Sequence, residues 1–107
     1  MRTSCRIYDP LFSRNDKKYI KIELPQDVAK SIEAIHKKKQ TTLDPLEGHI
    51  LCVKVPWRYN RIMCKNDGRS IYEATRGTIA LVEIEYKGPW FVNEFSGHTW
   101  VLKYINL

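Results

Sequence analysis

Aromatic and basic residues alternate along one short stretch of this sequence, Lys54–Lys65. If the stretch is extended, alternate side chains share a face, which places Val55, Trp57 and Tyr59 together. A strand of this kind begins in a core and ends as an exposed surface on which planar groups can stack. Single-stranded nucleic acid is held by such surfaces, because aromatic rings stack on the bases while neighbouring Lys and Arg side chains neutralise the phosphates. The stretch therefore predicts a surface that binds nucleic acid.

Twelve residues are the candidates for this surface. Four aromatic side chains are expected to stack on bases: Trp57, Tyr59, Trp90 and Tyr19. Eight cations, from two separate parts of the chain, are expected to contact phosphates: Lys54, Arg58, Arg61, Lys65, Arg69, Lys17, Lys18 and Arg14. Because every base has a π-face, the pattern predicts little sequence preference and fits DNA and RNA alike.

The same side chains fit a second class of function. Exposed Trp, Tyr and Arg side chains also dominate the binding energy of protein surfaces. A protein–protein interaction module, a small subunit of a larger assembly or a homo-oligomer is therefore the alternative. It is also open whether Trp57 and Tyr59 are buried, with Arg58 and Arg61 only solvated. One groove that joins residues 14–21 to residues 54–69 would favour nucleic acid.

The positive charge of the chain lies in two separated stretches. The formal net charge of +6 comes from 18 Lys and Arg against 12 Asp and Glu. Residues 1–25 hold six basic and three acidic residues, and residues 49–78 hold six and two. Residues 26–48 balance to zero, and the last 29 residues carry −1. If the fold brings the two basic stretches together, one face is positive and suits a polyanionic partner.

Groups that could perform catalysis or bind a metal are scattered. His49 and Cys52 are the only close pair of metal ligands, and residues three apart in a strand point to opposite faces. Glu83 and Glu85 alternate on one face, which an exposed strand explains more simply than paired catalytic carboxylates. No glycine-rich loop could cradle the phosphates of a nucleotide cofactor. The sequence predicts a protein that is not an enzyme and has no metal or cofactor.

Cysteine usage and hydropathy predict a location inside the cell. Three cysteines, an odd number at irregular spacing, do not suit a disulfide framework, so reduced thiols acting as small apolar side chains are expected. The longest apolar runs have three or four residues, and the start of the chain has no apolar stretch of signal-peptide length. We therefore expect the cytoplasm or the nucleus, and no membrane partner.

The elements that position these residues follow from the spacing of apolar side chains. One helix is predicted over about residues 26–39, where Val28, Ile32 and Ile35 fall on one face. Trp100, Leu102 and Tyr104 share a strand face and are expected in the core. Strands are predicted over these ranges: Cys5–Tyr8, Lys17–Leu24, His49–Val55 continuing towards Met63, Ile79–Tyr86, Trp90–Phe95 and His98–Ile105.

Turn residues separate these strands. A hairpin is expected around residues 13–16, and further turns at residues 66–68, 87–89 and 96–97. One helix with five or six strands predicts a single α+β domain over residues 1–107, mainly antiparallel β. The architecture is either a small OB-like barrel or a curled five- to six-stranded sheet with the helix packed on one face.

The second half of the chain carries a family resemblance. Its spacing is Gly77-x-Ile79-x-Leu81-x-x-Ile84, then Tyr86-x-Gly88-x-Trp90, then Gly97-x-x-Trp100-x-Leu102-x-x-Ile105. This resembles the C-terminal strands of small OB-fold single-stranded-DNA-binding proteins of bacteriophages and large DNA viruses. In those proteins a strand opened by glycine is followed by a short aromatic turn and a final strand. The resemblance implies an OB fold and a viral protein that binds single-stranded DNA.

Overall fold

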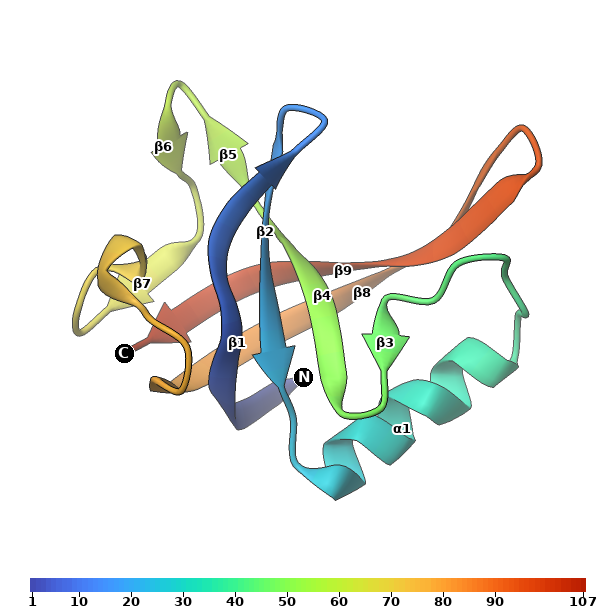
Figure 1. The fold of residues 1–107 in the computed structure, drawn as a ribbon, viewed down its shortest axis with the longest axis horizontal. Coiled ribbons are helices and arrows are strands. Elements are labelled where there is room, and N and C mark those ends of the chain that lie inside the picture. The colour runs from blue at the N-terminus through green and yellow to red at the C-terminus, as the bar shows by residue number, and fades with distance from the viewer.

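Strands make up most of the protein, as the alternation of apolar side chains predicts. The computed structural model describes residues 1–107 and is shown in Figure 1. The helices are α1 (Gln26–Lys37) and the short 3-10 helix η1 (Ile71–Glu73). The strands are β1 (Arg2–Arg14), β2 (Lys17–Glu23), β3 (Leu46–Glu47), β4 (Ile50–Val55), β5 (Trp57–Arg58), β6 (Arg61–Ile62), β7 (Lys65–Asp67), β8 (Ile79–Val92) and β9 (Phe95–Asn106).

Five strands close into a ring in the order β1–β2–β4–β9–β8. All neighbours in the ring are antiparallel except β4 and β9, which meet in parallel at Lys54 and Val101. The fold is thus α+β with a small OB-like barrel, which confirms the predicted class. Because the short β3 and β7 pair with β4 and β9, the sheet has seven strands, rather than five or six.

The barrel encloses one core. Alternation along β2 buries Ile20 and Ile22, and alternation along β4 buries Leu51, Val53 and Val55. Eighteen buried apolar residues form a single cluster, which includes Cys5. Burial raises the pKa of the Cys5 thiol to about 12, so this thiol is neutral. All three cysteines are free.

In the sequence, the helix α1 comes between β2 and β3. In space it covers the barrel below β3 and β4 in Figure 1. Ala29, Ile32 and His36 are its buried residues. It ends at Lys37, two residues before the predicted end, because the N–H groups of Lys38 and Lys39 bond to carbonyls three residues back. Neither α1 nor η1 has the length and apolar character needed to cross a lipid bilayer.

The predicted long strand from His49 towards Met63 is wrong beyond Val55. Pro56 cannot donate a ladder hydrogen bond, and the chain leaves the sheet there. β5 and β6 then form a separate two-stranded hairpin. Its turn consists of Tyr59 and Asn60, both with left-handed backbone angles (φ 54° and 60°).

The predicted turns at residues 87–89 and 96–97 are also wrong. β8 continues to Val92 through a register shift between Tyr86 and Gly88, and Gly88 accommodates it with a φ of 97°. The turn instead follows Val92, where Asn93 has a φ of 55°. β8 and β9 therefore extend beyond the barrel as a long two-stranded ribbon.

A second register shift, between Glu83 and Ile84, changes the predicted face of β9. Trp100 and Leu102 are in the core as predicted, with exposed fractions of 2% and 0%. Tyr104 is only half-buried, and Ile105 takes the buried position beyond the shift. The prediction of a core Tyr104 is therefore wrong.

Candidate nucleic-acid interface

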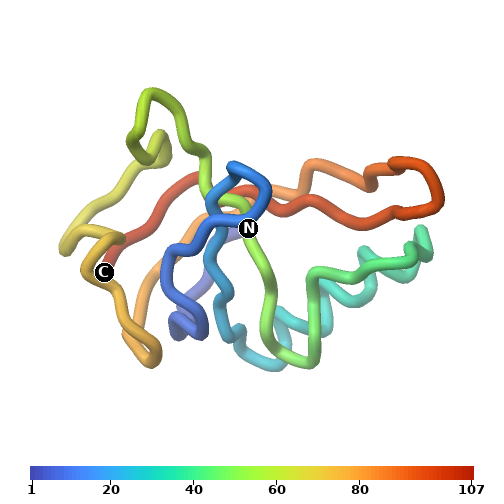
Figure 2. The backbone as a smooth tube through the Cα atoms, turned by 45° about the horizontal axis from the view of Figure 1, so that its top comes forward, coloured from blue at the N-terminus to red at the C-terminus, as the bar shows by residue number.

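Two basic stretches that are distant in sequence meet at one end of the barrel. The β5–β6 hairpin lies beside the turn that joins β1 and β2, as both Figure 1 and Figure 2 show. The Nζ atom of Lys18 is 4.7 Å from the centre of the Trp57 ring. The same ammonium group donates a hydrogen bond to Ser13 Oγ at 2.6 Å. Trp57 is half-buried and does not belong to the core cluster.

The outer face of β1, β2 and β4 carries a second group of the predicted residues. Tyr19 lies opposite Lys54 in the β2–β4 register, and Arg14 lies opposite Lys17 across the hairpin. The Arg14 guanidinium carbon is 4.8 Å from the centre of the Tyr19 ring. Phe12 stacks on Tyr19 with ring centres 5.8 Å apart. Since side chains alternate along β2, Lys18 and Tyr19 lie on opposite faces of the hairpin end.

The tip of the β5–β6 hairpin is strongly exposed. Tyr59 has an exposed fraction of 79% and occupies a turn position with positive φ. Arg58 and Arg61 are paired on either side of it and are exposed as well. L-residues other than Asn, Asp and Gly are disfavoured in this conformation. An exposed tyrosine there contributes nothing to the core, which points to a role at the surface.

The eight predicted cations share one electrostatic property. None of them forms an ion pair within 4.0 Å, although five other basic residues do, with Asp9, Glu33 or Glu85. Three of the eight, Lys18, Arg14 and Lys65, lie over aromatic rings instead. Their charges are therefore not neutralised by carboxylates within the protein.

Lys65 and Arg69 lie apart from this end of the barrel, around β7. The Nζ atom of Lys65 is 5.9 Å from the centre of the Tyr104 ring, and the Arg2 guanidinium carbon is 5.0 Å from it. The Tyr104 hydroxyl donates to Asp67 Oδ2 at 3.1 Å. The Arg69 side chain is exposed, and its backbone N–H donates to the Leu107 carbonyl. These two cations are not brought to Trp57.

Trp90 is also separate from Trp57. It lies in the β8–β9 ribbon, which extends to the opposite side of the molecule from the β5–β6 hairpin (Figures 1 and 2). Its indole lies flat against Gly97, its cross-strand partner, where an added Cβ would come within 2.6 Å of the ring. Packing against Gly97 therefore fixes the position of this ring.

Sequence reasoning missed two residues of the candidate interface, Phe12 and Ser13. Phe12 contacts the Tyr19 ring, and Ser13 orients the Lys18 ammonium group. Both residues could have been predicted from the hairpin turn, because a hairpin centred on residues 15 and 16 pairs residue 12 with 19 and residue 13 with 18. The predicted strand stopped at Tyr8, so these cross-strand pairs were not considered.

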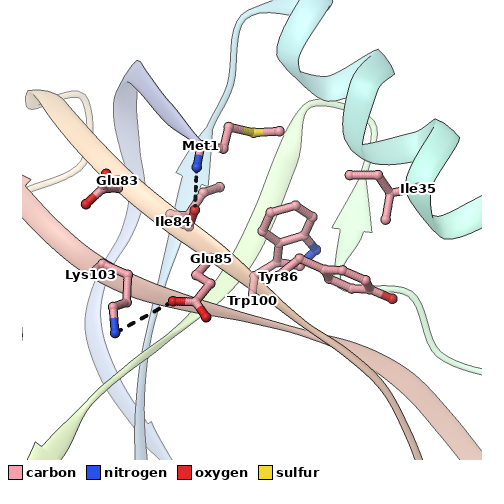
Figure 3. A pocket seen from close by; sticks show the side chains of 8 residues that line it. All are labelled: Met1, Ile35, Glu83, Ile84, Glu85, Tyr86, Trp100 and Lys103. Atoms are coloured by element: carbon pink, nitrogen blue, oxygen red, sulfur yellow. Dashed lines mark hydrogen bonds and ion pairs between the residues drawn. The ribbon is translucent and has the colours of Figure 1, made fainter.

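A pocket of about 430 Å³ opens elsewhere, between α1 and strands β8 and β9 (Figure 3). Ile35 faces Tyr86 and Trp100 across it. Glu83 and Glu85 also line it, and Glu85 is paired with Lys103 and Lys87. None of the twelve predicted residues lines this pocket.

Two stacked histidines connect α1 to the β8–β9 ribbon. The rings of His36 and His98 are 4.1 Å apart and nearly parallel, and each residue is only 5% exposed. Trp100 Nε1 donates to His36 Nε2, so the proton of a neutral His36 is on Nδ1, which donates to Asp44. His98 Nε2 donates to the Lys39 carbonyl, so its Nδ1 faces the Tyr86 hydroxyl.

Burial of this cluster has an electrostatic cost. Desolvation lowers the pKa of His36, the neighbouring His98 lowers it further, and Asp44 opposes both effects. With both ring nitrogens engaged, neither His36 nor His98 offers a free nitrogen for catalysis or metal binding. No group of three or more His, Cys, Asp or Glu side chains converges anywhere in the structure.

Comparisons of this chain with protein families, with curated proteins and with solved structures gave no match. The family resemblance of the second half is therefore carried by residue spacing alone.

Proposed function

We propose that this protein binds single-stranded nucleic acid, DNA or RNA, at the end of the barrel formed by the β1–β2 and β5–β6 hairpins. It binds the strand without catalysing a reaction on it and with little sequence preference. Trp57 and Tyr59 stack on bases there, and Tyr19 offers a further stacking ring on the outer face of β1, β2 and β4. The phosphates are neutralised by the unpaired cations of the two hairpins and β4: Arg14, Lys17, Lys18, Lys54, Arg58 and Arg61.

One observation carries this proposal. The contact between Lys18 and Trp57 joins the two basic stretches, and none of the six cations has a carboxylate partner. Unpaired cations beside solvent-accessible rings suit a single-stranded chain, because the cations neutralise its phosphates while the rings stack on its bases. Aromatic residues at a core position or cations in ion pairs would not fit this function.

The direct test is titration of the protein with oligothymidine at low salt. Stacking on Trp57 is expected to quench tryptophan fluorescence, since Trp100 is buried and Trp90 is distant. Neutralising four or five phosphates predicts that the logarithm of the binding constant falls with the logarithm of salt concentration at a slope of about −3. If micromolar protein shows no quenching and no salt-dependent binding with oligothymidine or oligouridine, the proposal is rejected.

Tyr59→Asn is expected to separate stability from binding. Asn adopts left-handed angles readily, whereas an ordinary L-residue loses about 1–2 kcal/mol there. The variant should gain about 1 kcal/mol in the free energy of unfolding and several degrees in Tm. Its affinity for oligothymidine should nevertheless fall, since one stacking ring is lost. Calorimetry and anisotropy titration measure the two effects, and binding as tight as the wild type's would remove Tyr59 from the interface.

A protein–protein interaction module is the second candidate function. The observation that favours it lies on the ribbon, where Phe91, Val92 and Phe95 have exposed fractions of 60%, 58% and 51%. Exposed aromatic side chains are also typical of protein interfaces. Light scattering over a range of concentrations, with and without oligothymidine, distinguishes the two: self-association without nucleic-acid binding would favour this second function.

A further inference from the structure

The ammonium group of Lys18 occupies a position that a base would need. It lies 4.7 Å from the centre of the Trp57 ring and is held there by the hydroxyl of Ser13. Ser13 is the cross-strand partner of Lys18, so the pairing of β1 with β2 fixes both groups. No carboxylate competes for Lys18. The ring of Trp57 is therefore covered from the side of the β1–β2 hairpin in the free protein.

We propose that Lys18 is a specificity-determining residue, which favours stacking on Trp57 by a base that carries a phosphate over stacking by a neutral planar group. This inference rests on the proposed function. In the free protein the ammonium group covers the ring, and in the complex it moves onto the phosphate next to the stacked base. The favoured ligand is then a charged nucleotide strand, and neutral planar molecules are disfavoured.

The energetics follow from exchanging one partner for another. A cation over a solvent-accessible indole is held by a contact that favours the covered state by about two- to fivefold. A neutral base that stacks on Trp57 must displace the cation into water, so its affinity is lower by that two- to fivefold factor. A base that carries a phosphate recovers this affinity, because the displaced ammonium group forms a charge-assisted contact with the phosphate. Lys18 thus opposes one class of ligand and assists the other.

Lys18→Ala provides the test, with two octathymidines as probes. One has ordinary phosphodiester linkages, and the other has methylphosphonate linkages, which present the same bases without charge. Binding of each is followed by NMR titration of the Trp57 indole resonance. The variant is expected to bind the neutral strand about two- to fivefold more tightly and the charged strand more weakly, with a salt slope reduced by about 0.7.

Lys17→Ala is the matched control. Lys17 is adjacent to Lys18 but lies on the other face of the hairpin and makes no cation–π contact. Its loss should weaken only the charged strand and leave the neutral strand unchanged. If Lys18→Ala affects both strands in the same direction, or leaves the neutral strand unchanged, Lys18 is an ordinary phosphate contact and the inference is wrong.

A second measurement needs no variant. In the free wild-type protein, the Lys18 ε-methylene protons should show the upfield ring-current shift of groups that lie over an indole. On saturation with octathymidine they should return to ordinary lysine values. Resonances that stay upfield in the complex overturn the inference alone. A wild-type protein that does not bind octathymidine overturns the proposed function and this inference together.

Discussion

Lowering the pH from 7.5 to 5 is expected to destabilise the protein through one residue, His36. Its imidazole is 5% exposed and accepts a hydrogen bond from Trp100 Nε1 on the nitrogen that a second proton would occupy. Protonation of Nε2 would place its N–H against the Trp100 N–H, so that two donors face each other. It would also place a positive charge on a ring stacked 4.1 Å from His98. Burial of the imidazole is the main reason why the folded protein holds the pKa of His36 below its ordinary value, and the neighbouring His98 adds to the effect, although Asp44 opposes both.

The sign of the effect follows from proton linkage. Because the pKa of His36 is lower in the folded state, the unfolded chain takes up a proton first as the pH falls below about 6.5. The stability from a neutral His36 is complete above that pH and is lost below it, at up to about 1.4 kcal/mol per pH unit. Exposed carboxylates with lowered pKa values, such as Glu33 and Glu85, lose their contribution only at more acidic pH.

Two variants isolate His36 in thermal or urea unfolding across this range. Gln at position 36 offers an acceptor for Trp100 but does not titrate, so His36→Gln should be nearly as stable at pH 5 as at pH 7.5. His49→Gln is the matched control, since His49 is exposed and has no side-chain hydrogen bond, and it should lose stability as the wild type does. Equal losses in wild type and His36→Gln would show that another group causes the effect.

The elements with strong local patterns could be predicted from the sequence. The alternation along β2 and the apolar face of α1 depend on neighbouring residues only, and both are observed. The turn at Tyr59 and Asn60 was not predicted, because such turns are recognised by Asn-Gly or Asp-Gly and this one contains no glycine. Gly88 was interpreted as a turn residue, whereas its positive φ serves a bulge inside β8.

The arrangement of the site was less predictable than its residue types. The pattern identified Lys18 and Trp57, but their contact depends on the pairing of β2 with β4, which is not encoded in either segment alone. His36 lies four residues after Ile32, so helical spacing did place it on the buried face. Its partner Trp100 is 64 residues away, however, so the hydrogen bond between them could not be read from the helix pattern.

Trp57→Ala is expected to have the largest effect on binding, weakening the affinity for oligothymidine by about 1–3 kcal/mol. The salt slope should stay unchanged, because a stacking ring neutralises no phosphate. Arg58→Ala and Arg61→Ala should instead each reduce the slope by about 0.7, since each cation has no carboxylate partner and is free to pair with a phosphate. Anisotropy of a labelled strand measures all variants without depending on tryptophan emission.

Trp90→Ala is the control that tests where on the protein the strand binds, at the barrel end or along the ribbon. Both tryptophans are half-buried, and the sequence pattern assigned both to the interface. The structure separates them, with Trp57 beside Lys18 and Trp90 against Gly97 in the distant ribbon. The affinity should therefore fall only for Trp57→Ala, while Trp57→Phe, which keeps a stacking ring, should retain most of it. A loss as large for Trp90→Ala would mean that the strand is bound along the ribbon and that the barrel end is not the centre of the interface.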